Sequence, residues 1–261
     1  MKRARKRFGQ HFLHDPAVIA RIVAAIALQP GDAAVEIGPG RGALTSQLLA
    51  AAGRLDAVEI DRDLAAELSA RFAAQPHFTL HEQDALEMDW RSLALLRGTR
   101  LRVVGNLPYN ISTPLLFRLL RDAGSILDMH FMLQKEVVDR ILAPPGSRTY
   151  GRLTVMLAPL ARAVRVLEVG AGAFQPPPQV SSAMVRLTVE PSPPEWARTP
   201  LYATLVTAAF GQRRKTLRNA LGGLLDASQI SALGIDPGAR AEVLAPEQFG
   251  ALARAAAGSI R

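Results

Sequence analysis

The sequence predicts an α/β fold: a mostly parallel seven-stranded sheet covered by helices on both faces, followed by a small C-terminal all-helical domain. Two observations predict it. Short apolar runs alternate with segments of helical spacing up to about residue 189, as in parallel strands joined by helices. Beyond the proline-rich stretch Pro191–Pro194, the chain is rich in alanine and leucine and contains no convincing strand. We therefore expect one domain at residues 1–190 and a helical domain at residues 195–261.

Each strand is predicted from a short apolar or alternating run. Ala33–Ile37, for example, lies between Pro30-Gly31 and Gly38-Pro39-Gly40, which limit it to the length of a buried strand. The other predicted strands are Leu55–Ile60, His77–His81, Leu101–Val104, Met129–Leu133, Val164–Val169 and Ala183–Val189. Apolar residues at helical spacing predict helices around Leu44–Leu49, Leu64–Phe72, Ser112–Leu120 and Val137–Ile141.

Composition excludes several classes of protein. The 261 residues are 49% hydrophobic and 21% charged, which is the composition of a globular chain. The absence of cysteine excludes disulfides, thiolate zinc sites, iron–sulfur clusters and cysteine nucleophiles. No apolar run approaches the length of about 18 residues that a transmembrane helix needs. The basic N-terminus leads into Phe8-Gly9-Gln10 rather than an apolar core, so we expect no secretory signal and a cytoplasmic location.

The charge balance favours a polyanionic partner. Lysine and arginine number 31 against 23 acidic residues, which gives a net charge of +8 and a pI of about 10.7. The excess is clustered at the N-terminus and near residue 214. The residues expected to contact nucleic-acid phosphates are Arg5, Lys6, Arg7, Arg213, Arg214, Lys215 and Arg218. We expect the second cluster on one helical face. The alternative for the N-terminal cluster is a solvated tail, and the alternative for the second cluster is a helix held by ion pairs.

Three segments that follow predicted strands carry groups suited to a nucleoside ligand. Gly38-Pro39-Gly40-Arg41-Gly42 is a glycine-rich turn between a strand and a helix, with G-x-G-x-G rather than dinucleotide spacing. Glu59 ends the second strand, where an acid can accept both ribose hydroxyls. Asp84 follows the third strand, where it can accept an adenine amine. Each has a plainer alternative, a tight turn or a capping acid.

The fourth segment, Gly105-Asn106-Leu107-Pro108-Tyr109, directly follows the fourth strand. An exocyclic amine on a base is nearly planar, because its lone pair is delocalised into the ring. The amide oxygen of Asn106 and the carbonyl of Leu107 can hold the N–H bonds of such an amine and expose its lone pair. Tyr109 can stack on a base that has left its helix or loop. The alternative is a strand-ending turn.

These segments occur in the order found in S-adenosylmethionine-dependent adenine-N6 methyltransferases. Over nearly its whole length the chain resembles the small-subunit ribosomal RNA adenine-N6,N6-dimethyltransferase family (KsgA/RsmA type). The resemblance also rests on Arg5–Gln10, Phe131–Val137, Phe174-x-Pro176-x-Pro178 running into Ser182, and Phe210–Thr216. It implies a Rossmann-like class I methyltransferase domain, with a basic arm and cofactor-closing segment at residues 1–16.

The resemblance also implies roles for individual residues. Cofactor contacts would be His11, Leu13, Gly38, Gly40, Glu59, Asp84 and Asn106. Asn106, Leu107, Pro108, Tyr109 and Phe174 would form the catalytic set, with Tyr109 and Phe174 bracketing a flipped adenine. The family often has Asn where this chain has His11; both side chains can donate a hydrogen bond, but histidine is bulkier.

The implied reaction is dimethylation of two adjacent adenosines in a hairpin near the 3′ end of small-subunit (16S) ribosomal RNA, during ribosome biogenesis. The cofactor would be S-adenosyl-L-methionine, the product S-adenosyl-L-homocysteine, and no metal is expected. Expected partners are this RNA and the immature small subunit; we expect a monomer with no membrane partner. The alternatives are a large-subunit ribosomal RNA dimethylase of the antibiotic-resistance type and a non-catalytic assembly or transcription factor. A nicotinamide oxidoreductase is disfavoured by the glycine spacing and the pI.

Overall fold

The computed structural model describes residues 11–108, 111–212 and 214–259, and these form two compact units. The first unit contains the described residues up to Val138 together with Val164–Pro191. The second contains Asp139–Ala163 and the described residues from Ser192 onward. The chain thus changes unit at the proline-rich stretch, but residues 139–163, placed by sequence in the first domain, pack in the second unit. The physical reason is that Tyr150 and Val155 are buried in its core.

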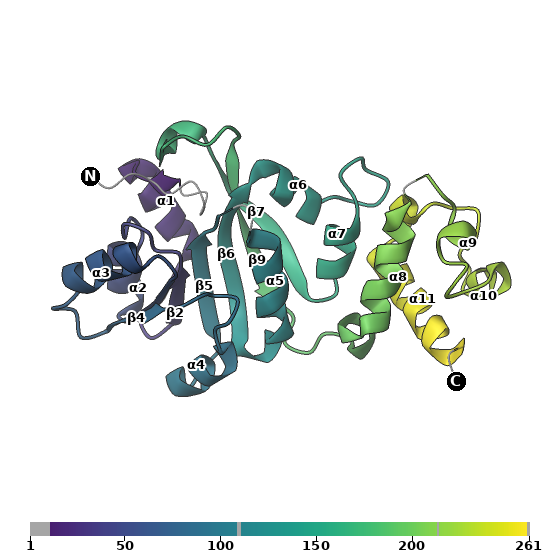
Figure 1. Cartoon of the computed structure of the whole chain (residues 1–261), viewed down its shortest axis with the longest axis horizontal. Helices are drawn as coiled ribbons and strands as arrows, with labels where there is room; N and C mark the ends of the chain where they lie inside the picture. The colour runs from purple at the N-terminus through teal and green to yellow at the C-terminus, as the bar shows by residue number, and fades with distance from the viewer. Residues whose placement is uncertain (1–10, 109–110, 213, 260–261) are drawn as a thin grey trace. The chain divides into compact units, whose positions relative to one another are not determined.

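The sheet has seven strands in the order β4-β3-β2-β5-β6-β9-β7 (Figure 1). The strands are β2 Ala33–Ile37, β3 Leu55–Glu59, β4 Phe78–Glu82, β5 Leu101–Asn106, β6 Ile126–Gln134, β7 Ala161–Val169 and β9 Ser182–Val189. Neighbouring strands from β4 to β6 are parallel, whereas β6 and β9 are antiparallel. The prediction of a mostly parallel seven-stranded sheet is therefore confirmed, and β6 and β7 each begin three residues before their predicted starts.

Helices accompany the strands along the chain. They are α1 Pro16–Ile26, α2 Thr45–Ala52, α3 Arg62–Arg71, α4 Trp90–Arg97, α5 Ser112–Arg121 and α6 Lys135–Ile141, with short 3₁₀ turns η2 Ala123–Ser125 and η3 Ala171–Ala173. α2 packs against β2 and β3, α3 packs against β3 and β4, and α5 packs against β6 (Figure 1). Strands β2 and β3 are buried along their whole length, as expected for strands between helical layers.

Two helices of the first unit, α1 and α4, were not predicted from the sequence. α1 begins where the Asp15 carboxylate accepts hydrogen bonds from the N–H groups of Ala17 and Val18, with Pro16 in the first turn. Asp89 caps α4 in the same way by accepting from Ser92. These carboxylates are start signals that the apolar spacing alone did not reveal.

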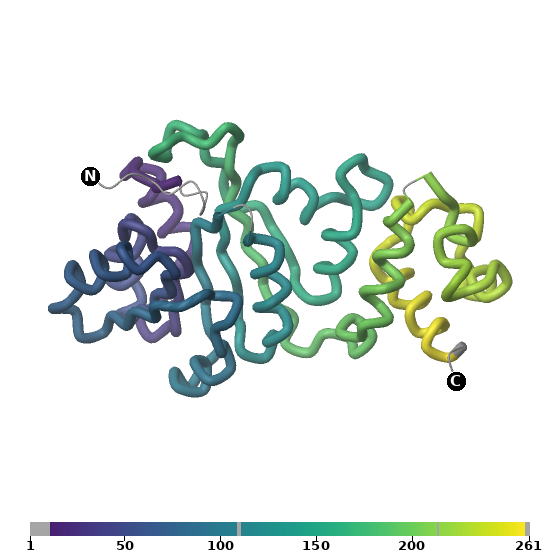
Figure 2. The backbone as a smooth tube through the Cα atoms, viewed as in Figure 1, coloured from purple at the N-terminus to yellow at the C-terminus, as the bar shows by residue number. Residues whose placement is uncertain are grey.

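A second, two-stranded sheet joins distant parts of the first unit. β1, Phe12–Leu13, pairs antiparallel with β8, Phe174–Gln175. Figure 2 shows this green segment of the chain beside the purple N-terminal part. His14 also donates its N–H to the carbonyl of Ala173 at 3.0 Å. The pairing fixes the segment that precedes α1 beside the loop between β7 and β9.

The second unit is helical, as predicted. Its further elements are α7 Arg152–Leu157, η4 Glu195–Arg198, α8 Pro200–Gly211, α9 Leu217–Ala220, α10 Ala227–Ala232, η5 Ala241–Val243 and α11 Pro246–Ser259. Its core contains Leu205, Leu252 and Phe249. The buried Tyr150 and Tyr202 hydroxyls donate to the carbonyls of Leu244 and Val155, both at distances below 2.9 Å. Segment 139–163 therefore closes the core of this unit.

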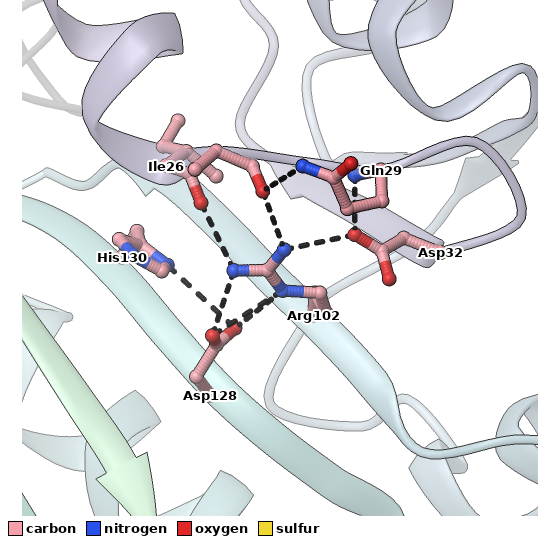
Figure 3. Close-up of polar contacts among 7 residues, drawn as sticks. Ile26, Gln29, Asp32, Arg102, Asp128 and His130 are labelled. Atoms are coloured by element: carbon pink, nitrogen blue, oxygen red, sulfur yellow. Dashed lines mark hydrogen bonds and ion pairs between the residues drawn. The ribbon is translucent and has the colours of Figure 1, made fainter.

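Arginines neutralise buried acids at the edge of the sheet where the parallel strands begin. Arg102 on β5 donates to Asp128 on β6 and to Asp32, as well as to the carbonyls of Ile26 and Ala27 (Figure 3). Burial opposes the charge of Arg102, but the two carboxylates outweigh that cost and raise its pKa. The network ties the end of α1 to the start of two strands.

A second ion-pair cluster lies at the same edge. The buried carboxylate of Asp56, near the start of β3, accepts two hydrogen bonds from Arg97 at 2.7 Å each and one from His81 at 2.8 Å. Burial raises the pKa of Asp56, but these hydrogen bonds outweigh it and lower the pKa overall.

Within the described residues, no helix combines the length and apolar character needed to cross a membrane.

Candidate active site

A cavity of about 620 Å³ lies at the opposite edge of the sheet, where strands β2, β3 and β5 end. Ligands of open α/β sheets bind at this edge. Its lining includes all ten described residues that the sequence assigned to the cofactor or to catalysis. They are His11, Leu13, Gly38, Gly40, Glu59, Asp84, Asn106, Leu107, Pro108 and Phe174. The fold thus brings these residues together, although their individual roles remain predictions. Tyr109 lies outside the described residues.

The glycine-rich turn forms one wall of the cavity. Gly38 and Gly40 have φ values of +64° and +59°, in the left-handed region that favours glycine. A Cβ on Gly40 would lie 3.2 Å from the ring of Phe12, so a side chain there would crowd β1. The guanidinium of Arg41 lies 4.5 Å from the centre of the same ring. The turn can therefore present bare backbone to a ligand and still lie close against the N-terminal segment.

Glu59 is held firmly at the end of β3. One carboxylate oxygen accepts the N–H of Gly40 at 3.1 Å, and the other accepts the N–H of Asp61 at 2.9 Å. Burial raises the pKa of Glu59, and the two N–H groups only partly oppose that effect. The hydrogen bond to Gly40 links the predicted ribose acceptor directly to the glycine-rich turn.

Glu36 is a cavity residue that sequence reasoning missed. It lies inside β2, is 2% exposed, and accepts a hydrogen bond from the Thr45 hydroxyl at 2.6 Å. Burial is the main cause that raises the pKa of Glu36 to about 7, and the nearby charge of Glu59 acts in the same direction. The hydrogen bond from the Thr45 hydroxyl opposes this effect. The available signal was an acid inside a strand that was otherwise apolar and predicted to be buried.

Asp84 forms the capping hydrogen bond that the sequence offered as one alternative, and its ligand-binding role stays a prediction. It follows β4, lines the cavity, and accepts the N–H of Leu86 at 2.8 Å. That hydrogen bond closes a local turn, as the capping alternative expects. Only one oxygen, Oδ1, is used in this turn, so the same side chain can also serve a ligand.

The end of β5 and the two residues that follow it are fixed by close packing and hydrogen bonds. A Cβ on Gly105 would lie 2.8 Å from the carbonyl oxygen of Ile37, so only glycine lets β5 and β2 approach here. The amide nitrogen of Asn106 donates to the carbonyl of His11 at 2.9 Å. Pro108 accepts from the N–H of Ile111 at 3.2 Å, which forms a turn. With its nitrogen used in this way, the Asn106 amide has its oxygen to offer as an acceptor.

The N-terminal segment reaches the cavity through its pairing with β8. The His11 imidazole Nδ1 lies 2.9 Å from the carbonyl oxygen of Pro176, and a carbonyl can only accept, so this nitrogen donates. Leu13 and Phe174 are 6% and 2% exposed and belong to the same apolar cluster. Because Phe174 is buried, stacking on a base requires its ring to expose a face, and that role stays a prediction.

The predicted basic residues are only partly described. Arg5, Lys6, Arg7 and Arg213 lie outside the described residues. Arg214, Lys215 and Arg218 are exposed, and none of them forms an ion pair with another described residue. The expectation of a single helical face is wrong, because α8 ends at Gly211 and α9 begins only at Leu217. Arg214 and Lys215 lie in the connecting turn.

No group of three or more His, Asp or Glu side chains suited to a metal ion occurs in the part of the chain that the structure describes. The cavity instead offers backbone, an amide and carboxyl groups. Its two most buried acids, Glu36 and Glu59, form no ion pair with any described residue. The site is therefore suited to an organic ligand that brings hydrogen-bond donors and positive charge.

Comparisons with known proteins identify the family to which this fold and sequence belong. The family model described as ribosomal RNA adenine dimethylase matches residues 1–257. Ribosomal RNA small subunit methyltransferase A of Methylococcus capsulatus is 54% identical over 250 residues, which cover 96% of each chain. A crystal structure of a dimethyladenosine transferase from Plasmodium falciparum is similar with a TM-score of 0.79 and 25% identity, covering 93% of this chain and 96% of that one.

The structure of the 23S rRNA methyltransferase ErmE is also similar, with a TM-score of 0.71 and 26% identity over 94% of this chain and 99% of that one. Both solved structures support the Rossmann-like methyltransferase fold with its helical C-terminal part. The family match extends over almost the whole chain and confirms the resemblance inferred from the motifs. The chain belongs to the ribosomal RNA adenine dimethylase family.

Proposed function

We propose that this protein uses S-adenosylmethionine to dimethylate the N6 amines of two adjacent adenosines in a hairpin near the 3′ end of small-subunit (16S) ribosomal RNA. One observation carries the proposal. In a chain of this family, the glycine-rich turn, Glu59, Asp84 and Asn106 line a single cavity at the ligand-binding edge of the sheet. These are the groups that a nucleoside cofactor and an adenine amine require.

The cavity fits S-adenosylmethionine. Its volume of about 620 Å³ lies within the range of small-molecule sites. Glu59 offers carboxylate oxygens to ribose hydroxyls, and Asp84 offers one to the adenine amine. The bare backbone at Gly38 suits the methionine portion. When bound, this cofactor supplies a methyl group on a positively charged sulfur, so the protein needs no metal to activate it.

Asn106 and Leu107 act on the target amine. The hydrogen bond from the Asn106 nitrogen to the His11 carbonyl fixes the amide, so that its oxygen is available to accept an N–H of the adenine. The Leu107 carbonyl accepts the second N–H. Together they draw the amine away from planarity and direct its lone pair toward the methyl donor. After one transfer the methylated nitrogen is cationic and releases a proton to solvent, which leaves it with one N–H and a lone pair, so the same groups can position it for the second.

Recognition of RNA is assigned to aromatic and basic side chains. Tyr109 and Phe174 bracket the flipped adenine. Their rings replace part of the base stacking that the adenine loses when it leaves its helix or loop. Arg214, Lys215 and Arg218 contact phosphates, together with the basic residues 5–7 and Arg213. The exposure of Arg214, Lys215 and Arg218 supports this role and speaks against the alternative of an ion-paired helix.

The small-subunit substrate is favoured over the large-subunit one. The relative from Methylococcus capsulatus named as a small-subunit methyltransferase is 54% identical to this chain, against 26% for ErmE. The partner we propose is the immature small ribosomal subunit, met by a monomer in the cytoplasm.

A methyl-transfer assay with defined substrates tests the proposal. Purified protein is incubated with radiolabelled S-adenosylmethionine and either unmethylated small subunits or protein-free large-subunit RNA. Mass spectrometry of nuclease fragments then locates dimethyladenosine. We expect label in two adjacent adenosines of the small-subunit hairpin. Label only in large-subunit RNA would establish the alternative substrate, and absence of both cofactor binding and transfer would favour a non-catalytic factor.

A further inference from the structure

Glu36 occupies an unusual position among the buried acids of the sheet. Asp56 and Asp128, at the edge where the strands begin, each contact an arginine. Glu36 is as well buried, but its only described hydrogen-bond partner is the neutral hydroxyl of Thr45. No described cation forms an ion pair with it. Glu36 is one of the residues that line the cavity, so a ligand bound there can supply the missing positive charge.

We infer that Glu36 is a specificity-determining residue that favours the positively charged cofactor over its uncharged product, by releasing a proton to solvent when the cofactor binds. The inference rests on the proposed function, because it takes S-adenosylmethionine as the ligand. It adds a role for a residue that none of the motif assignments includes, and it couples the charge of the ligand to the charge of the cavity.

The cofactor and its product differ in charge at the sulfur atom. The sulfonium of the cofactor carries a positive charge that the thioether of the product lacks. In a cavity of low polarity, a positive charge stabilises the ionised form of a nearby buried carboxyl group. The ionised Glu36 in turn stabilises the cation. Its affinity contribution is therefore larger for the cofactor than for the product.

Protons released by other groups that line the cavity must be distinguished from the proton of Glu36. Its strand neighbour Glu59 belongs to β3 and adds negative charge, and Thr45 of α2 donates a hydrogen bond. The remaining titratable or charged side chains of the lining are His11, His14, Arg41 and Asp84. The measurement therefore needs a variant that removes the Glu36 proton alone.

Burial raises the pKa of Glu36 to about 7, which fixes the expected pH dependence. The side chain is mostly protonated at pH 6, half protonated at pH 7 and mostly ionised at pH 8. If the bound cation lowers that pKa by about one unit, binding releases about 0.4, 0.4 and 0.1 protons at these three pH values. Affinity for the cofactor consequently falls as the pH is lowered from 8 to 6.

Isothermal titration calorimetry of the full chain measures this release. S-adenosylmethionine and S-adenosylhomocysteine are each titrated at pH 6, 7 and 8 in buffers of different ionisation enthalpy. We expect the release attributable to Glu36, the difference between wild type and E36Q, to be larger for the cofactor than for the product. We also expect E36Q to reduce the ratio of the two affinities about three- to tenfold, equivalent to at most one pKa unit of coupling.

Substitutions of Thr45 provide a matched pair. T45V removes the hydroxyl that favours the ionised form, so more protons should be released at pH 8 than in the wild type. T45S keeps a hydroxyl and should behave like the wild type. A general packing defect would not be confined to the variant that lacks the hydroxyl.

The outcomes distinguish this inference from the proposed function. If the protein binds no S-adenosylmethionine, the proposed function fails as well. If it binds the cofactor with the same proton release in wild type and E36Q, or if Glu36 releases equally for both ligands, only the inference about Glu36 is overturned. If E36Q does not fold, T45V and T45S supply the comparison, and equal proton release at pH 8 in T45V and in the wild type overturns the inference about Glu36.

Discussion

Buried acids have different partners, and pKa values shifted in opposite directions, at the two edges of the sheet. Where the strands begin, Asp128 meets Arg102, and Asp56 meets Arg97 and His81 (Figure 3 shows the first cluster). Where the strands end, Glu36 and Glu59 are buried beside the cavity and meet a hydroxyl and backbone N–H groups. The pKa of Asp56 is lowered, whereas the pKa values of Glu36 and Glu59 are raised.

This difference separates a structural edge from a functional one. A buried carboxylate without a cation is destabilising, because desolvation is not offset by attraction to an opposite charge. Arginine at one edge removes that cost and ties loops and helices to the strands. At the other edge the cost is retained, which is typical of sites that bind or transform a ligand.

The largest expected effect is on stability at the structural edge. D128N leaves Arg102 with only one carboxylate, so we expect the free energy of unfolding to fall by about 3 to 5 kcal/mol. Urea unfolding at pH 8 measures it. Cofactor affinity should change by no more than about twofold, because the site lies at the other edge. A loss below about 1 kcal/mol would remove the contrast between the edges.

The next effect concerns stability and pH. The folded-state pKa of Glu36 is about 7, and its ordinary value is 4.5, so the unfolded chain ionises first as the pH rises. Glu36 therefore contributes stability below pH 4.5, and about 3 kcal/mol of it is lost between pH 4.5 and 7. In E36Q the free energy of unfolding should decline less over this interval, as measured by urea unfolding at several pH values.

H130L is the matched variant at the structural edge. His130 is fully buried, and burial lowers its pKa from 6.5 to about 4, against the attraction of Asp128. The unfolded chain binds this proton first as the pH falls, so stability is lost between pH 6.5 and 4. H130L should flatten that decline. It should leave unchanged the stability that Glu36 causes the protein to lose as the pH rises toward 7. Equal pH profiles for E36Q and H130L would contradict the distinction.

A third prediction concerns catalysis at the functional edge. N106A should reduce methyl transfer about 100-fold or more, because it removes the amide that positions the target amine. RNA affinity should stay within a few-fold of wild type, since phosphate contacts lie elsewhere. Single-turnover transfer and filter binding measure the two quantities. A parallel loss of RNA affinity would assign Asn106 to binding rather than to chemistry.

The smallest effect is expected from exposed charges of the second unit. The double variant R214A/K215A should lower the salt dependence of RNA binding by about two units of log–log slope, one for each lost phosphate contact. Cofactor affinity and unfolding free energy should be unchanged, because both side chains are exposed. An unchanged slope would mean that this turn does not touch RNA.

The local sequence predicted most of the sheet. Strand β2 is short, mostly apolar and lies between Pro30-Gly31 and Gly38, so its position follows from neighbouring residues alone. The same holds for the turn at Gly38–Gly40 and for Asn106–Pro108. Since parallel strands end at one edge, their sequence order alone predicted that these groups would meet there.

Tertiary structure decided what no local pattern contains. The pairing of Phe12–Leu13 with Phe174–Gln175 brings His11 to the Pro176 carbonyl, through hydrogen bonds between parts of the chain far apart in sequence. The packing of residues 139–163 with the helical unit depends likewise on distant apolar partners. Spacing identifies an acid in a strand, but only the completed packing determines whether a cation lies beside it, as for Asp128, or not, as for Glu36.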